Sequence, residues 1–210
     1  MSVNGTISST ISVGGVSMSS TITRSKSSVV SHNFSLPAGN ASTDWARTDN
    51  DTGEATLASA HTITDGDVVC VSWSGGCRYG MVATVDGTSV VVEGGAGDNL
   101  PVDDTTVTVS TVQHLNTDFS GDEVYIAAAS CDQNANIHFR TSEASGAGGS
   151  VLAKNLAQNE AWEWHSTDGT DPSADATNDL AGSLISQVDA ANRSTTAATL
   201  KLAVLYDGVS

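Results

Sequence analysis

Histidine and cysteine are the side chains of this sequence that are best suited to hold a transition metal, but their spacing forms no chelating motif. Short pairs such as Cys-x2-Cys or His-x3-His, from which zinc sites are built, are absent. We therefore expect the histidines to be ordinary strand or loop residues. They are His32, His61, His114, His138 and His165.

Serine is abundant, yet nothing in its spacing indicates a nucleophile. No Gly-x-Ser-x-Gly elbow occurs, and the nearest match, Gly15 to Ser19, lies beside a predicted hairpin turn rather than at a strand-to-helix corner. Glu160 and Glu163 are not arranged as a glycosidase pair by any visible feature. The sequence therefore predicts a protein that is not an enzyme.

Two acidic loops are the only features of the sequence that could bind a hard cation such as Ca²⁺. The Gly-rich loop GGAGDNLPVDD, residues 94–104, carries carboxylate and amide oxygens that could wrap a Ca²⁺ ion. These candidate ligands are Asp98, Asn99, Asp103 and Asp104. A second loop, residues 168–175, lacks the Gly and the closing Glu of an EF-hand. Because Asp and Gly also populate plain solvated turns, we favour turns and predict no cofactor, with Ca²⁺ as the alternative.

Two tryptophans alternate with glutamates in the segment EAWEW. On a β-strand this spacing places Trp162 and Trp164 on the same face. Such a pair could stack on a sugar ring or fill the space between two sheets. We favour a core or a subunit interface, because the chain has few other large aromatic side chains.

The charge balance excludes several partners. With 24 acidic against 8 basic residues, the formal net charge of −16 repels nucleic acid phosphates and anionic membranes. No apolar stretch is long enough to span a membrane, and no basic segment followed by an apolar run marks a secretion signal. We expect no direct nucleic acid partner, no membrane, and synthesis in a cytoplasm.

The cysteines are expected to be reduced and mostly buried. If Gly75-Gly76 is the two-residue turn of a hairpin, Cys70 faces Met81, and Cys70 and Cys77 lie beyond the ~7 Å limit between Cα atoms of a disulfide.

The first segment, TISSTISVGGVSMSSTIT, is mirrored about Gly14-Gly15, which predicts a hairpin with a two-residue turn. Pairing outward from this turn places one set of apolar side chains on one face. This set is Ile7, Ile11, Val13, Val16, Met18 and Ile22. Because a lone two-stranded ribbon is not stable in water, we expect a cover, either the C-terminal sheet of the same chain or a neighbouring subunit.

Alternating apolar residues and Gly or Asp punctuation predict an all-β protein. The fold class expected is an antiparallel, jelly-roll-like β-sandwich with an inserted small β-barrel module. Residues 1–45, a hairpin and a strand, are expected to pack with residues 113–210 as the sandwich. Residues 46–112 form the inserted barrel-like module. Residues 180–191 also fit helical spacing, but a strand is favoured there because a turn and a clear strand follow.

The stretches GDVVCVSWSGGCRYG, GGAGDNLP and AATLKLAVLYDG resemble small all-β virion structural proteins of tailed bacteriophages, of the head decoration or head/tail accessory type, and similar uncharacterised prophage-like proteins. The resemblance implies a structural subunit located in the virion. Its partners would be copies of itself and other virion proteins, such as a major capsid or tail protein. The alternative from the residues themselves is a calcium-assisted carbohydrate- or surface-binding β-sandwich module.

Overall fold

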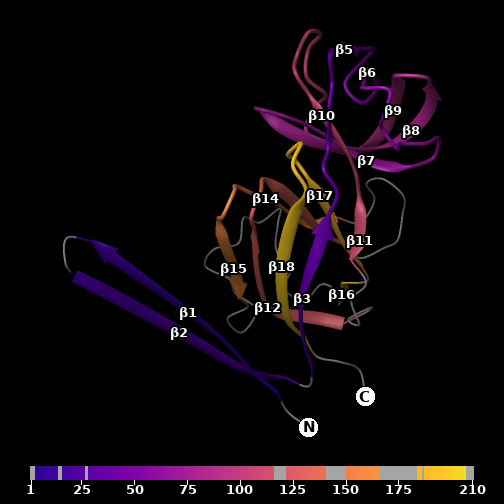
Figure 1. Cartoon of the computed structure of the whole chain (residues 1–210). Coiled ribbons are helices and arrows are strands. Elements are labelled where there is room, and N and C mark those ends of the chain that lie inside the picture. The colour runs from indigo at the N-terminus through magenta and orange to yellow at the C-terminus, as the bar shows by residue number, and fades with distance from the viewer. Residues whose placement is uncertain are drawn as a thin grey trace.

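The chain folds into antiparallel β-sheets in the computed structural model (Figure 1). The structure describes residues 3–13, 16–26, 28–115, 122–140, 150–165, 184–185 and 187–206. Within these ranges every helix or strand assigned is a strand, so the all-β class predicted from the sequence is confirmed. The same ranges contain no helix that is long and apolar enough to cross a membrane.

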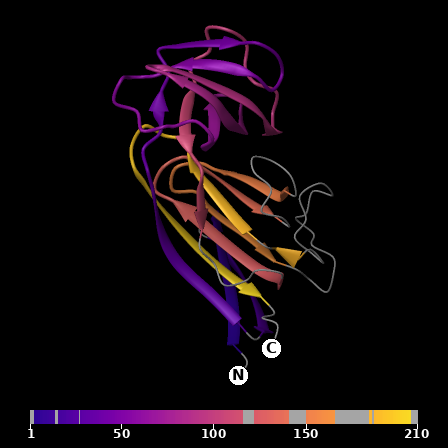
Figure 2. The same ribbon diagram turned by 90° about the vertical axis from the view of Figure 1, so that its right-hand side faces the viewer.

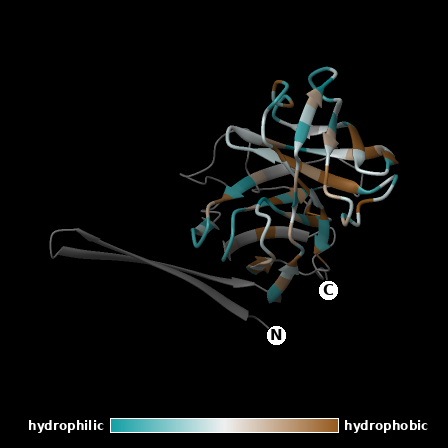
Figure 3. Ribbon diagram, turned by 45° about the horizontal axis from the view of Figure 1, so that its top comes forward, coloured by the Kyte–Doolittle hydropathy of each residue, from teal (hydrophilic) through white to brown (hydrophobic). Residues whose placement is uncertain are grey.

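A seven-stranded sheet curls into a half-barrel at one end of the molecule (Figure 2). In spatial order its strands are β4 (Asn40–Ala41), β10 (Thr108–Thr111), β7 (Val68–Trp73), β8 (Gly76–Asp86), β9 (Ser89–Gly97), β6 (Gly53–Thr56) and β5 (Asp44–Arg47). Hydrophobic residues concentrate along these strands, and the connecting loops are mainly hydrophilic (Figure 3). The buried Trp45 is the largest side chain of this core, and its indole Nε1 donates to Pro101 O at 3.0 Å.

Two further sheets pack face to face as a β-sandwich. The four-stranded sheet has the order β11 (Gln113–Leu115), β17 (Gln187–Asn192), β13 (Ala135–Arg140) and β14 (Ser150–Leu156). The other sheet has the order β15 (Ala161–His165), β12 (Asp122–Cys131), β18 (Ala198–Tyr206) and β3 (Ser28–Leu36), with β16 (Leu184–Ile185) paired to β12. One continuous hydrophobic core joins them. Because β16 and β17 are strands, the strand interpretation of this segment is confirmed over its described residues.

The N-terminal hairpin forms a two-stranded sheet of its own from β1 (Val3–Val13) and β2 (Val16–Lys26). Its register pairs Ile7 with Ile22, Ile11 with Met18 and Val13 with Val16, as the mirrored sequence predicts. Neither strand pairs with another described strand, and the ribbon projects away from the sandwich (Figure 1).

The division of the chain differs in two places from the predicted one. The hairpin and the third strand were both expected to pack with residues 113–210. Of the strands β1, β2 and β3, only β3 joins a sheet with strands of that segment. The half-barrel spans residues 40–111 rather than 46–112, because β4 and β5 pair with β10 and β6. The chain therefore enters the half-barrel directly from the end of β3.

The predicted turn between β7 and β8 is wrong by one residue. Trp73 pairs with Gly76, so the turn residues are Ser74 and Gly75. Gly76 is instead a strand residue, and a side chain there would overlap the Asp98 carboxylate, which accepts from Cys77 N at 3.1 Å. The glycine is needed for this close approach and not for the turn.

This register brings the first two cysteines together. Cys70 faces Tyr79 and Cys77 faces Ser72, so the two thiols are diagonal neighbours in one buried cluster rather than far apart. A hydrogen bond to the Cys77 thiol, together with burial, raises the pKa of Cys70 well above its ordinary value. Both thiols are free and buried, and so is Cys131, as predicted.

A bend in β9 tests how closely this half-barrel is packed. Gly95 has φ +81°, and a Cβ there would overlap the backbone carbonyl of Tyr79. We expect Gly95→Ala to lower the free energy of unfolding by more than about 3 kcal/mol, because backbone must move. Gly87, with φ +61° and open space around it, is the matched control, and Gly87→Ala is expected to cost about 1 kcal/mol. Urea unfolding measures both, and equal losses would contradict the packing argument.

Candidate functional site

The candidate site lies where the half-barrel meets the outer face of the four-stranded sheet. Strand alternation on β13 sends Ile137 and Phe139 into the sandwich core and leaves Asn136, His138 and Arg140 on the opposite face. These three polar residues are nevertheless buried. The junction therefore covers a polar face that alternation alone would leave in water.

Tyr79 on β8 covers one part of this face. Its ring stacks on the His138 imidazole, with 4.0 Å between centroids and 27° between planes. Its hydroxyl donates to Asn136 O at 3.5 Å. Burial raises the pKa of Tyr79 well above its ordinary value and lowers the pKa of His138 to about 4. Both rings are therefore uncharged near neutral pH.

Asp189 on β17 is the buried charge at the centre of this face. Its Oδ2 accepts from Arg140 Nη1 at 2.9 Å, and both side chains are almost completely buried. Its Oδ1 lies 2.7 Å from His114 Nδ1, and the Gln187 amide nitrogen also donates to it. Two opposite charges this far from water are tolerated only when they neutralise each other and their remaining polar atoms are satisfied.

An aspartate bound to a histidine is also part of catalytic groups, in which the imidazole acts as a general base. His114 is exposed and held by buried Asp189, so this part of such a group is present. In the described part of the chain, however, the hydrogen bonds of His114 go to Asp189 and Gln187, and no hydroxyl or thiol is bound to it. Because Arg140 shares the carboxylate, the geometry favours a structural ion pair.

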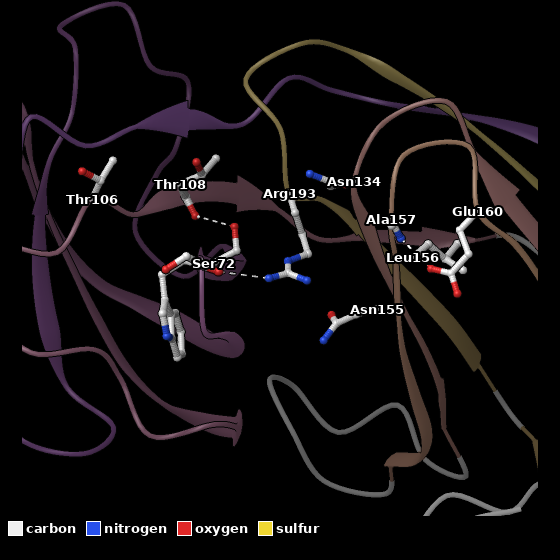
Figure 4. A pocket seen from close by; sticks show the side chains of 11 residues that line it. Ser72, Thr106, Thr108, Asn134, Asn155, Leu156, Ala157, Glu160 and Arg193 are labelled. Atoms are coloured by element: carbon white, nitrogen blue, oxygen red, sulfur yellow. Dashed lines mark hydrogen bonds between the residues drawn. The ribbon is translucent and has the colours of Figure 1, made fainter.

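A polar cleft of about 500 Å³ opens beside the junction, between the half-barrel and the sandwich (Figure 4). The half-barrel contributes Ser72, Trp73, Ser74, Thr106 and Thr108, and the sandwich contributes Asn134, Asn155, Leu156, Ala157, Glu160 and Arg193. Figure 4 shows the side chains of Arg193 and Asn155 directed into the space between the two parts.

Arg193 ties the two walls of the cleft together. Its Nη2 donates to Trp73 O at 3.2 Å and to Gly76 O at 3.0 Å. On the sandwich wall, Glu160 accepts from Lys154 Nζ and from Ala157 N, each at 2.8 Å. The hydrogen bond from Lys154 is the main cause of a lowered pKa of Glu160. The sandwich wall is thus fixed by its own hydrogen bonds, and Arg193 fixes it to the half-barrel wall.

Residues 94–104 were predicted to be a solvated turn or a calcium site. Two carboxylates of this loop accept hydrogen bonds from separate backbone N–H groups. Asp98 accepts from Cys77 N, and Asp103 Oδ1 accepts from Arg47 N at 2.6 Å. Asn99 and Asp104 are exposed. No three His, Cys, Asp or Glu side chains converge within the residues that the structure describes. The arrangement gives no support to a calcium site.

The two predicted aromatic residues lie in the sandwich. Trp164 is buried in the core, and Trp162 is half-buried and packs against Phe139 with 6.1 Å between ring centroids. Neither lines the polar cleft. The apolar residues of the hairpin lie in β1 and β2 with the predicted register, and the structure describes their backbone only.

Sequence reasoning missed the buried polar face and the cleft. The alternation in ANIHFR was visible, but polar residues at every second position normally indicate a solvent-facing side. Nothing in the sequence links Trp73 with Arg193, because the two are joined only by the docking of two sheets. Asp189 and Arg140 are likewise brought together only by the pairing of β13 with β17.

Comparison of the chain with known protein families, with curated proteins and with solved structures finds no match.

The buried ion pair should dominate the stability of the junction. We expect Asp189→Asn to lower the free energy of unfolding by about 3 kcal/mol, because the buried Arg140 loses its carboxylate partner. The matched control is Glu160→Gln, which removes the partner of Lys154 at a more exposed pair and should cost less than about 1 kcal/mol. Chemical denaturation measures both values, and a loss for Asp189→Asn as small as that of the control would contradict the assignment.

The stacked histidine should make stability depend on pH. Its pKa is lowered from 6.5 to about 4 by burial, so the unfolded chain binds a proton more readily than the folded one. Stability from this group is present above about pH 6.5 and is lost as the pH falls towards about 4, by up to about 3 kcal/mol. His138→Phe should flatten that part of the unfolding profile, whereas His32→Phe, at an exposed position, should not. Identical profiles for both variants would refute this attribution.

Proposed function

We propose that this chain is a structural subunit of a phage or phage-like particle, in which copies interlock through the β1–β2 hairpin. The observation that carries this proposal is that the hairpin is a separate sheet. Each strand has 11 residues, so the ribbon spans about 35 Å. A two-stranded ribbon is at best marginally stable in water, and one of this length needs a partner surface.

The backbone of the hairpin offers a direct way to bind that partner. The outer edges of β1 and β2 are unpaired with any other described strand. Such edges add readily to another sheet, with main-chain hydrogen bonds supplying affinity. A second copy of this chain is the partner that a repeated structure provides.

Charge supports the same partner. Arg24 and Lys26 are the only Lys, Arg, Asp or Glu residues before Asp44, and all 24 acidic residues follow from there. The hairpin is therefore basic, while the rest of the chain is strongly acidic. Opposite charges steer the hairpin of one copy towards the body of another, since two acidic bodies repel each other.

The sequence resemblance to virion proteins of tailed bacteriophages supports the assignment to a particle. A head decoration or head/tail accessory subunit acts through repeated contacts with its own copies and with a major capsid or tail protein. In this proposal the protein is made in the host cytoplasm and resides in the virion. The acidic body favours positions that do not bind DNA directly.

The hairpin should control assembly. We expect Ile11→Asn combined with Met18→Asn, which changes one apolar pair of the ribbon, to convert oligomers into monomers, because burial of that pair stabilises the contact. The matched control changes the adjacent pair, Thr10→Asn with Ser19→Asn, and should retain the oligomer.

Gel filtration with light scattering on the full chain measures the oligomeric state. Far-ultraviolet circular dichroism and the unfolding midpoint check that the half-barrel and the sandwich remain folded in both variants. A wild-type chain that is a strict monomer at all concentrations, or unchanged oligomers in the Ile11 and Met18 variant, would overturn assembly through the hairpin.

A further inference from the structure

We propose that the polar cleft between the half-barrel and the sandwich is a binding site for a neutral saccharide. This inference does not depend on the hairpin or on assembly. It follows from the size of the cleft, the chemistry of its walls, the balance of its charges and the position of Trp73.

The size and the polarity of the cleft suit a small polyhydroxylated molecule. Its volume of about 500 Å³ lies within the usual range of ligand pockets. Hydroxyl and amide side chains such as Ser74, Thr106 and Asn155 dominate the walls. Hydroxyls and amides both donate and accept hydrogen bonds, as sugar hydroxyls do. An acyl chain would leave these groups without partners.

The cleft lining carries charges of both signs, so it is not arranged to bind a ligand by its charge. An anion would meet the Glu160 carboxylate and the net charge of −16 of the whole chain. A cation would meet Arg193, which lines the cleft, and Lys154, which is bound to Glu160. A neutral ligand avoids both repulsions and can still accept a hydrogen bond from the guanidinium.

Trp73 supplies the apolar surface that a pyranose ring needs. It is half-buried at the end of β7 and lies in the cleft lining. Its ring packs so closely over Gly75 and Gly76 that a Cβ on either would lie 3.2 Å and 3.0 Å, respectively, from indole atoms. The indole also packs against the half-barrel core, so it is held in place before a ligand arrives, and its remaining surface is the part that would contact the C–H side of a sugar.

The guanidinium of Arg193 is likewise held in place before a ligand arrives. Its Nη2 is fixed by the two carbonyls of Trp73 and Gly76, and the residue itself is only half-buried, so part of the guanidinium side chain faces the cleft. A guanidinium has five N–H donors, so an oxygen atom of a ligand in the cleft can accept from it. A saccharide hydroxyl between Trp73 and Arg193 would use both groups at once.

The test is a titration of the isotope-labelled full chain, followed by two-dimensional NMR of the indole N–H signals. The neutral probes are oligosaccharides of glucose, galactose, mannose and N-acetylglucosamine, and an oligogalacturonate is the anionic comparison. Trp73→Phe assigns the Trp73 signal by its disappearance. We expect at least one neutral probe to shift this signal saturably and to leave the Trp162 signal unchanged.

Two substitutions locate the binding. Thr106→Arg places a long side chain at the exposed wall of the cleft and should weaken binding at least about tenfold, whereas Thr84→Arg, at an exposed position of β8 outside the cleft, should leave it unchanged. The inference is overturned if no neutral probe shifts Trp73 at about 10 mM, a concentration that detects even millimolar binding. It is also overturned if only the galacturonate binds, or if binding survives Thr106→Arg. A monomeric hairpin variant that still binds would separate this site from assembly.

Discussion

The burial of the ion pair of Asp189 and Arg140 depends on cover over the outer face of the four-stranded sheet. Both side chains are almost completely buried, and on an uncovered sheet they would lie in water. The stack of Tyr79 on His138 provides part of that cover. Separating the two parts would remove the contacts of Tyr79 with His138 and Asn136, so the half-barrel and the sandwich should behave as one cooperative unit.

A polar junction fixes geometry more narrowly than an apolar one of the same size. Apolar surfaces tolerate sliding, whereas the bonds from Arg193 to two carbonyls of β7 and β8 are satisfied in only one relative position. The hydrogen bond from Ser110 to Asn192 O and the bond from Gly39 N to Ser194 O, at 2.8 Å, add the same constraint near β10 and β4. The walls of the cleft therefore keep a fixed separation although they come from different sheets.

Local patterns predicted most of the strands, because alternation and turn residues act over a few positions. The hairpin register followed from the mirror about Gly14-Gly15, and the segment around Val188 was correctly interpreted as a strand. The position of the turn before Gly76 was predicted wrongly. This glycine is required by the close approach of Asp98, which is distant in sequence. The roles of Trp73 and Arg193 in the cleft were not predicted for the same reason, since only the docking of the two sheets brings these residues together.

Strand β3 connects the hairpin, to which we assign assembly, with the half-barrel, which forms one wall of the cleft. The hairpin enters at Ser28, whose partner is Tyr206, and the chain leaves at Leu36, whose partner is Ala198, directly into the half-barrel. With 9 residues, β3 separates these points by about 30 Å. The hairpin therefore leaves the sandwich at the end opposite the half-barrel (Figure 1). Because the cleft lies at the other end of β3, the root of the hairpin does not block a ligand from reaching the cleft of the same chain.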